Sequence, residues 1–124
     1  MEDVATSILV ILAGFTACVI HEGGHYLAAL FLTGKKLRFS FSLSWIANKI
    51  PVPRFTWNMP WTPDRWRRKV IALSGFGLEL LIAVIIMISA PKWPFSLVYT
   101  GVSVLHFFSY RFYAGEASDF KWLS

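Results

Sequence analysis

The sequence predicts an all-α membrane protein, with three transmembrane helices and a small β-hairpin in the loop between helices 1 and 2. Three observations lead to this fold class. Of the 124 residues, 56% are hydrophobic and only 15% are charged, whereas a soluble domain carries about 25% charged residues. The charged residues gather in a central segment and near the two ends. They leave three apolar stretches that are long enough to cross a bilayer.

The first apolar segment covers residues 4–32 and contains the motif HEGGH at residues 21–25. A continuous helix of this length measures roughly 43 Å, more than the ~30 Å hydrocarbon core requires. Gly34 is a natural end for the helix, because Lys35 and Lys36 follow it at the expected membrane surface. A chain of this total length is expected to form a single domain over residues 1–124.

Residues 37–57 are predicted to be rich in strand. Apolar and polar residues alternate from residue 37 to residue 45, which indicates a strand with one apolar face. Pro51 and Pro53 confine a second short strand to an edge, because proline donates no hydrogen bond to a ladder. Trp57, Trp61 and Trp66 are expected at the membrane–water interface, where an amphipathic ring is wet at one end only.

Two further helices are expected over residues 66–90 and 95–113. Thr62 and Pro63 indicate the start of the first of these, with Thr62 as its N-cap. Glu79 is the only charged residue in its membrane-buried part. A short turn with two prolines leads to the last helix, and the tail beyond residue 113 is polar enough to leave the lipid.

Basic residues are concentrated in the loop between the first and second helices, which holds nine of the twelve Lys and Arg residues. The N-terminus before the first helix has none, and the next loop has only Lys92. The positive-inside rule therefore predicts a cytoplasmic central loop and C-terminus, with the N-terminus outside. Because this rule accounts for the net charge of +5, the expected partner is the lipid bilayer and no nucleic-acid partner is expected.

The motif HEGGH has the spacing of a zinc site. His21 and His25 are four residues apart, so on a helix both imidazoles point to one face and can share an ion. Glu22 is angled to hold a water, whose proton it takes when the metal acidifies it. The alternative is that both histidines serve only as polar contacts between helices. Ionisable residues at membrane depth are costly and usually functional, which favours the zinc site.

Two histidines are too few for a catalytic zinc ion, which usually has three protein ligands. The preferred third ligand is Asp119, because it lies on the predicted cytoplasmic side in a segment that is free to fold back. His106 is the weaker second choice, and Glu79 is expected mainly as a hydrogen-bonding group between helices. The full set of candidates is Asp119, Glu116, Glu79, His106 and Cys18.

Arg111 precedes the C-terminal tail and has two possible roles. It stabilises a developing oxyanion if it faces the metal, but extension of its head group to the membrane interface is the favoured interpretation. The depth of the metal also has two solutions. Either residues 114–118 fold back as a re-entrant turn, or residues 26–34 project into the cytoplasm and the metal lies near the interface.

Three segments of this chain together resemble the site-2 protease family of intramembrane zinc metalloproteases. They are HEGGH in the first helix, ALSGFGLELL in the second and GEASDFKWL after the third. The resemblance implies zinc as cofactor, His21 and His25 as ligands, Glu22 as base and Asp119 as third ligand. The late motif departs from the usual family pattern, since Phe120 follows the aspartate where a glycine is typical.

The expected function is therefore a zinc-dependent intramembrane endopeptidase that hydrolyses peptide bonds of transmembrane protein substrates through a zinc-bound water activated by Glu22. Its edge strand could pair with an unwound substrate through Phe39, Phe41 and Leu43, or the hairpin could simply cover the site. The alternative function is a catalytically inactive pseudoprotease or membrane adaptor that binds transmembrane partners. A small metal carrier is a less favoured third interpretation.

Overall fold

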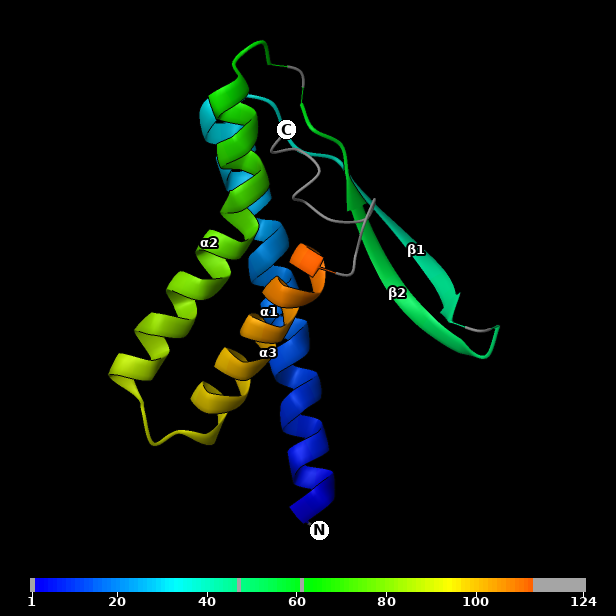
Figure 1. The fold of residues 1–124 in the computed structure, drawn as a ribbon, viewed down its shortest axis with the longest axis vertical. Coiled ribbons are helices and arrows are strands. Elements are labelled where there is room, and N and C mark those ends of the chain that lie inside the picture. The colour runs from blue at the N-terminus through cyan, green and yellow to red at the C-terminus, as the bar shows by residue number, and fades with distance from the viewer. Residues whose placement is uncertain (1, 47, 61, 113–124) are drawn as a thin grey trace.

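The computed structural model describes residues 2–46, 48–60 and 62–112 (Figure 1). Its elements follow one another as α1 (Glu2–Thr33), β1 (Phe39–Ile46), β2 (Ile50–Trp57), α2 (Arg65–Ser89) and α3 (Pro94–Phe112). The predicted mostly helical class is confirmed. The helix bounds differ from the expected ones by at most two residues at each end.

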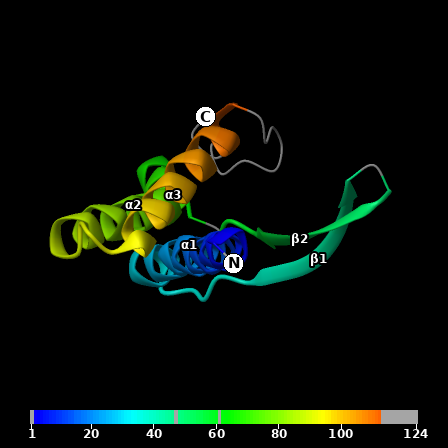
Figure 2. The ribbon, with the colours of Figure 1, turned by 90° about the horizontal axis from the view of Figure 1, so that it is seen from below.

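The three helices pack together, and the strands extend away from them. α1 is the longest element, and α2 and α3 lie along it as a connected antiparallel pair (Figure 1). The two strands project from α1 on the side opposite α2 (Figure 2). Their antiparallel register pairs Phe39 with Trp57 and Ile46 with Ile50. The start of β1 and the end of β2 are the ends nearest the helices (Figure 1).

One face of α1 makes the contact with the other helices. Apart from Gly24, its buried residues recur every fourth position, and most are small, namely Ala13, Ala17, His21, His25 and Ala29. Residues at this spacing form one stripe along a helix, and alanine lets a neighbouring backbone approach closely. The two histidines therefore lie in the middle of the face that packs against α2 and α3.

The C-terminal end of α1 and the N-terminal end of α2 are tied together. Gly34 has a φ of 68° and its N–H donates to the Leu30 carbonyl oxygen at 2.9 Å, as expected for a helix end that needs a left-handed residue. The Arg67 side chain donates to the Leu32 carbonyl oxygen at 3.0 Å. A cation at that position also suits the negative end of the α1 dipole.

The predicted N-cap of α2 is wrong. The helix begins at Arg65 with Asp64 as N-cap, and the Asp64 side chain makes no capping hydrogen bond. The physical reason is that Asp64 Oδ2 lies 3.1 Å from Nε of Arg67, one turn further on. Thr62 instead accepts the Asp64 N–H in the preceding turn, at 3.4 Å.

Two apolar clusters lie at different heights along the helices. The first cluster joins all three helices through Ala13, Ala17, Ala83 and Tyr99. The second cluster joins α1, α2 and the strand region through Ala29, Leu37, Trp57 and Ile71. Among the described helices, α1 and α2 are long and apolar enough to cross a membrane.

Candidate metal centre

His21 and His25 are fully buried in α1 and point their outer ring nitrogens at one another. The two Nε2 atoms are 3.1 Å apart, and the rings meet edge to face with their centroids 4.7 Å apart. One helical turn separates the two residues, which is why their side chains meet. The spacing in the sequence predicts this shared face.

The inner nitrogen of each imidazole contacts a hydrogen-bond acceptor on α2. Nδ1 of His25 lies 2.7 Å from the Ile71 carbonyl oxygen, and Nδ1 of His21 lies 3.0 Å from Oε2 of Glu79. A carbonyl or an ionised carboxylate only accepts, so we assign the ring proton to Nδ1 in both histidines. In the neutral rings, both Nε2 lone pairs then point into the same space.

This arrangement fits a metal ion. Two Nε2 atoms 3.1 Å apart are close enough to bind one cation together. Neutral imidazole is a common zinc ligand. A ligand histidine almost always donates its other ring N–H to a carboxylate or a backbone carbonyl. His21 and His25 meet that condition with one acceptor of each kind.

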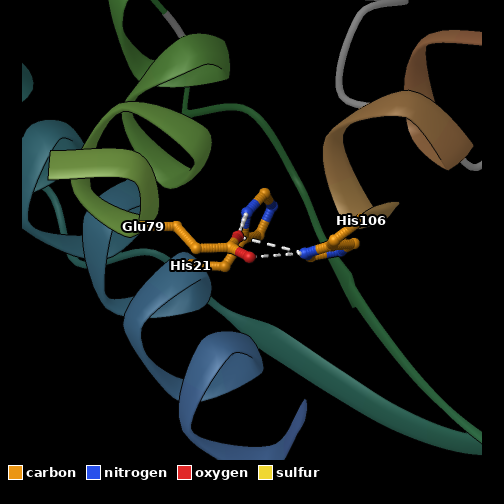
Figure 3. Close-up of side chains that lie close together, drawn as sticks. All are labelled: His21, Glu79 and His106. Atoms are coloured by element: carbon orange, nitrogen blue, oxygen red, sulfur yellow. Dashed lines mark hydrogen bonds and ion pairs between the residues drawn. The ribbon is translucent and has the colours of Figure 1, made fainter. Parts of the chain in front are cut away.

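A second group of possible ligands lies on the other side of the His21 ring. Glu79 of α2 is fully buried, and His106 of α3 points its Nδ1 at both carboxylate oxygens, at 3.0 and 3.2 Å (Figure 3). One ligand atom from each of His21, Glu79 and His106 lies within 4.8 Å of the others. A metal ion held by this second group leaves out His25.

Aromatic rings enclose the imidazoles. Trp57, at the end of β2, is 8% exposed and lies over His25 with ring centroids 4.4 Å apart. Phe76 packs edge to face against His21 at 4.3 Å and also contacts His106. Such walls limit the access of solvent and strengthen the electrostatic interactions inside.

The closeness of α1 and α2 at this site requires two glycines. A Cβ on Gly75 would lie 2.6 Å from Nε2 of His25 and 2.9 Å from Cε1 of His21. A Cβ on Gly24 would overlap the Ser74 carbonyl oxygen and lie 3.0 Å from Cα of Gly75. α2 therefore passes directly over the imidazole pair.

The two glycines of HEGGH differ in this respect. Among the described residues, nothing lies within 4 Å of a Cβ on Gly23, and the same holds for Gly77 on α2. Gly24 thus allows α1 and α2 to approach each other closely, whereas the space beside Gly23 is open.

The other predicted site residues lie at several places. Glu22 is half-buried on α1, and its Oε2 atom is shielded from solvent. Arg111 is exposed in the last turn of α3. Phe39, Phe41 and Leu43 of β1 are exposed as well. Asp119 and Glu116 lie outside the described residues, and Cys18 is exposed on α1.

The sequence analysis does not assign four groups to this site that lie against the two imidazoles. They are the Ile71 carbonyl, Gly75, Phe76 and Trp57. The only sequence signal for Gly75 is its place in the glycine-containing segment SGFG, four residues before Glu79. A backbone carbonyl carries no sequence signal at all.

Comparisons of the chain with known protein families, with curated proteins and with solved structures find no match. The functional argument therefore rests on the chemistry of the site.

Proposed function

We propose that this chain is a zinc-dependent intramembrane endopeptidase of the site-2 protease type, which hydrolyses peptide bonds of transmembrane protein substrates. One observation carries the proposal. The Nε2 atoms of His21 and His25 lie 3.1 Å apart while both Nδ1 atoms contact acceptors on α2. Inside the H-E-x-x-H pattern, that arrangement favours a hydrolytic zinc site over a simple helix contact.

The catalytic roles follow from the chemistry of these side chains. His21 and His25 hold the zinc ion, with Asp119 as the expected third ligand. The bound ion supplies Lewis acidity, which acidifies water and polarises a peptide carbonyl. Glu22 accepts the proton of the attacking water and donates it to the amine nitrogen of the leaving peptide. Arg111, exposed in the last turn of α3, is assigned to the interface.

Membrane insertion is supported by the apolar surface of the helices. α1 and α2 are long and apolar enough to span a bilayer. Large apolar side chains are exposed on all three helices, including Phe15 and Phe31 of α1, Ile88 of α2 and Leu105 of α3. A soluble monomer rarely exposes apolar surface on this scale. We propose three spans, with the central loop and the C-terminus in the cytoplasm as the basic residues predict.

The contacts with α2 support a metal site close to the cytoplasmic surface. Ile71, whose carbonyl binds His25, follows Lys69 by two residues, about 3 Å along the helix axis. Arg65, Arg67 and Arg68 lie one to four residues beyond Lys69, toward the start of α2. This arrangement favours the solution in which residues 26–34 project from the membrane. Water then reaches the site without crossing the lipid.

The strands give the substrate a place to bind. The described strands form a two-stranded sheet, so each strand has an outer edge that pairs with no other described strand. The base of the sheet contacts the site, because Trp57 lies over His25 and Phe39 over Tyr26. We propose that an extended substrate segment pairs with β1 beside Phe39, Phe41 and Leu43.

The test uses the full chain in detergent or nanodiscs, with a panel of single-span peptides that carry a helix-breaking residue in the span. We expect wild-type protein to bind about one zinc ion and to cleave members of the panel. Glu22→Gln should keep the zinc and lose activity by about 10²- to 10⁴-fold.

Undiminished cleavage by Glu22→Gln would contradict the mechanism. A wild-type protein that binds zinc but cleaves no peptide of the panel would support the adaptor function instead. Zinc content also tests the third ligand. We expect Asp119→Ala to reduce bound zinc, and an Asp119→Ala variant with full zinc would remove Asp119 from the site.

A further inference from the structure

Glu79 is a buried carboxylate that the proposed catalytic chemistry does not use. It lies on α2 with 0% exposure. Side chains from both other helices approach it: His21 of α1 at 3.0 Å and His106 of α3 at 3.0 Å, both through Nδ1 to Oε2 (Figure 3). An isolated ionised carboxylate in such a place is very costly, so these two donors must offset its burial.

The backbone of Glu79 is also held by α3. The hydroxyl of Tyr99, itself 1% exposed, donates to the Glu79 carbonyl oxygen at 3.2 Å. Main chain and side chain are thus fixed from the same neighbouring helix. Because Glu79 is held by Tyr99, His21 and His106, its carboxylate has little freedom to turn toward a metal ion at the Nε2 atoms of His21 and His25.

We infer that Glu79 is a positioning residue of the zinc site, which fixes the His21 imidazole in the orientation that aims Nε2 at His25, and that His106 holds Glu79 in place without binding the metal. The inference rests on the proposed zinc function. Under this inference, the metal ligands among the described residues all lie on α1. The side chains of α2 and α3 hold those ligands in position. Carboxylate, histidine and metal in a row form a recurrent arrangement in zinc proteins.

The competing arrangement places the metal among His21, Glu79 and His106. It would leave His25 outside the site, although His25 is fully buried and its Nδ1 contact with Ile71 directs Nε2 toward His21. Because the Nε2 pair uses both histidines, it accounts for more of the observed contacts.

The test measures zinc affinity by competition with a chelator, together with the visible spectrum of the cobalt-substituted protein. We expect Glu79→Gln to bind one zinc ion with about 10- to 100-fold weaker affinity, the usual cost of losing an outer partner. At saturating cobalt its spectrum should keep the wild-type form, because the ligands are unchanged. Gly77→Ala, on the same helix with open space around the new methyl, is the matched control and should bind like wild type.

Two results would overturn the inference while the proposed function stands. Wild-type affinity in Glu79→Gln would show that the carboxylate does not position the ligand. Complete loss of binding in a Glu79→Gln protein that still elutes as a folded monodisperse species would make Glu79 a ligand. If wild-type protein itself binds no zinc, the proposed function fails, which is a different and recognisable outcome.

A second pair of variants tests the assignment even if Glu79→Gln does not fold. We expect His25→Ala to lose zinc and His106→Gln to retain one zinc ion with a smaller loss of affinity than Glu79→Gln. The reverse pattern, with zinc kept in His25→Ala and lost in His106→Gln, would place the metal in the competing arrangement.

Discussion

α1 meets its two partner helices in different ways. Against α2 the contact is so close that neither Gly24 nor Gly75 has room for a methyl group. Against α3 there is a hollow of about 300 Å³. Its lining residues are Gly14, Ala17, Cys18, Val102, Leu105, His106 and Ser109.

The difference separates two tasks within a small bundle. α2 supplies the acceptors of both imidazoles and presses its backbone against their rings. α3 contacts the carboxylate through His106 and packs Tyr99 against the alanines of α1. Between these helices it also leaves the hollow beside Gly14 and Cys18. We therefore expect zinc binding to respond strongly to changes on the α2 side and weakly to changes in the hollow.

Gly75→Ala should have the largest effect. Its methyl group would occupy the position 2.6 Å from Nε2 of His25 and 2.8 Å from Cε1 of that ring, so the imidazole must turn away. We expect bound zinc to fall from about one ion per chain to almost none. Metal analysis of the purified variant measures this, with Gly77→Ala as the control. A Gly75→Ala variant that keeps about one zinc ion per chain would contradict the close approach of Gly75 to the two imidazoles.

Gly24→Ala should separate the two helices. The added methyl would meet the backbone of Ser74, which cannot rotate aside as a side chain can. Overpacking of this kind costs about 1–3 kcal/mol in the free energy of unfolding. Gly23→Ala is the matched control, because its methyl points into open space and alanine favours the helix by about 1 kcal/mol. Equal stability of the two variants in a denaturation experiment would contradict the close contact.

Arg67→Ala tests the end of the same interface. The variant loses the hydrogen bond to the Leu32 carbonyl and the pair with Asp64, in which both side chains are partly exposed. We expect a loss of about 0.5–1.5 kcal/mol in the free energy of unfolding. Arg65→Ala removes the same charge from an exposed position nearby. A larger loss in Arg65→Ala than in Arg67→Ala would exclude the contact with α1.

Gly14→Ala should have the smallest effect on the metal. Gly14 lines the hollow, and among the described residues nothing lies within 4 Å of a Cβ built there. We expect wild-type zinc affinity, measured by the same chelator competition. An affinity loss as large as that of Glu79→Gln would show that the α3 side is as tightly coupled to the metal as the α2 side.

The sequence was most informative about α1. Helical spacing alone predicts that His21 and His25 share a face, since residues four apart meet on any helix. The apolar composition predicts the helical class and the approximate ends of α1, α2 and α3. These properties depend on neighbours within one segment, which a sequence pattern records directly.

Contacts between segments were harder to predict. The rotation of α2 about its axis decides that Gly75 and the Ile71 carbonyl face the imidazoles, and no local pattern specifies that rotation. Trp57 is 8% exposed and lies over His25, a contact that the expectation of an interfacial position does not include. The position of the strands against α1 decides this contact. Glu79 was expected to join helices by hydrogen bonds, and its bonds to His21 and His106 agree with that role.

The most direct test of the account is X-ray absorption at the zinc edge of the purified, zinc-loaded chain. The count of imidazoles bound to the metal is the quantity of interest. We expect two in wild-type protein, two in His106→Gln and fewer in any zinc retained by His25→Ala. Two imidazoles that persist in His25→Ala, or a wild-type protein without bound zinc, would contradict the assignment of His21 and His25 as the metal ligands of α1.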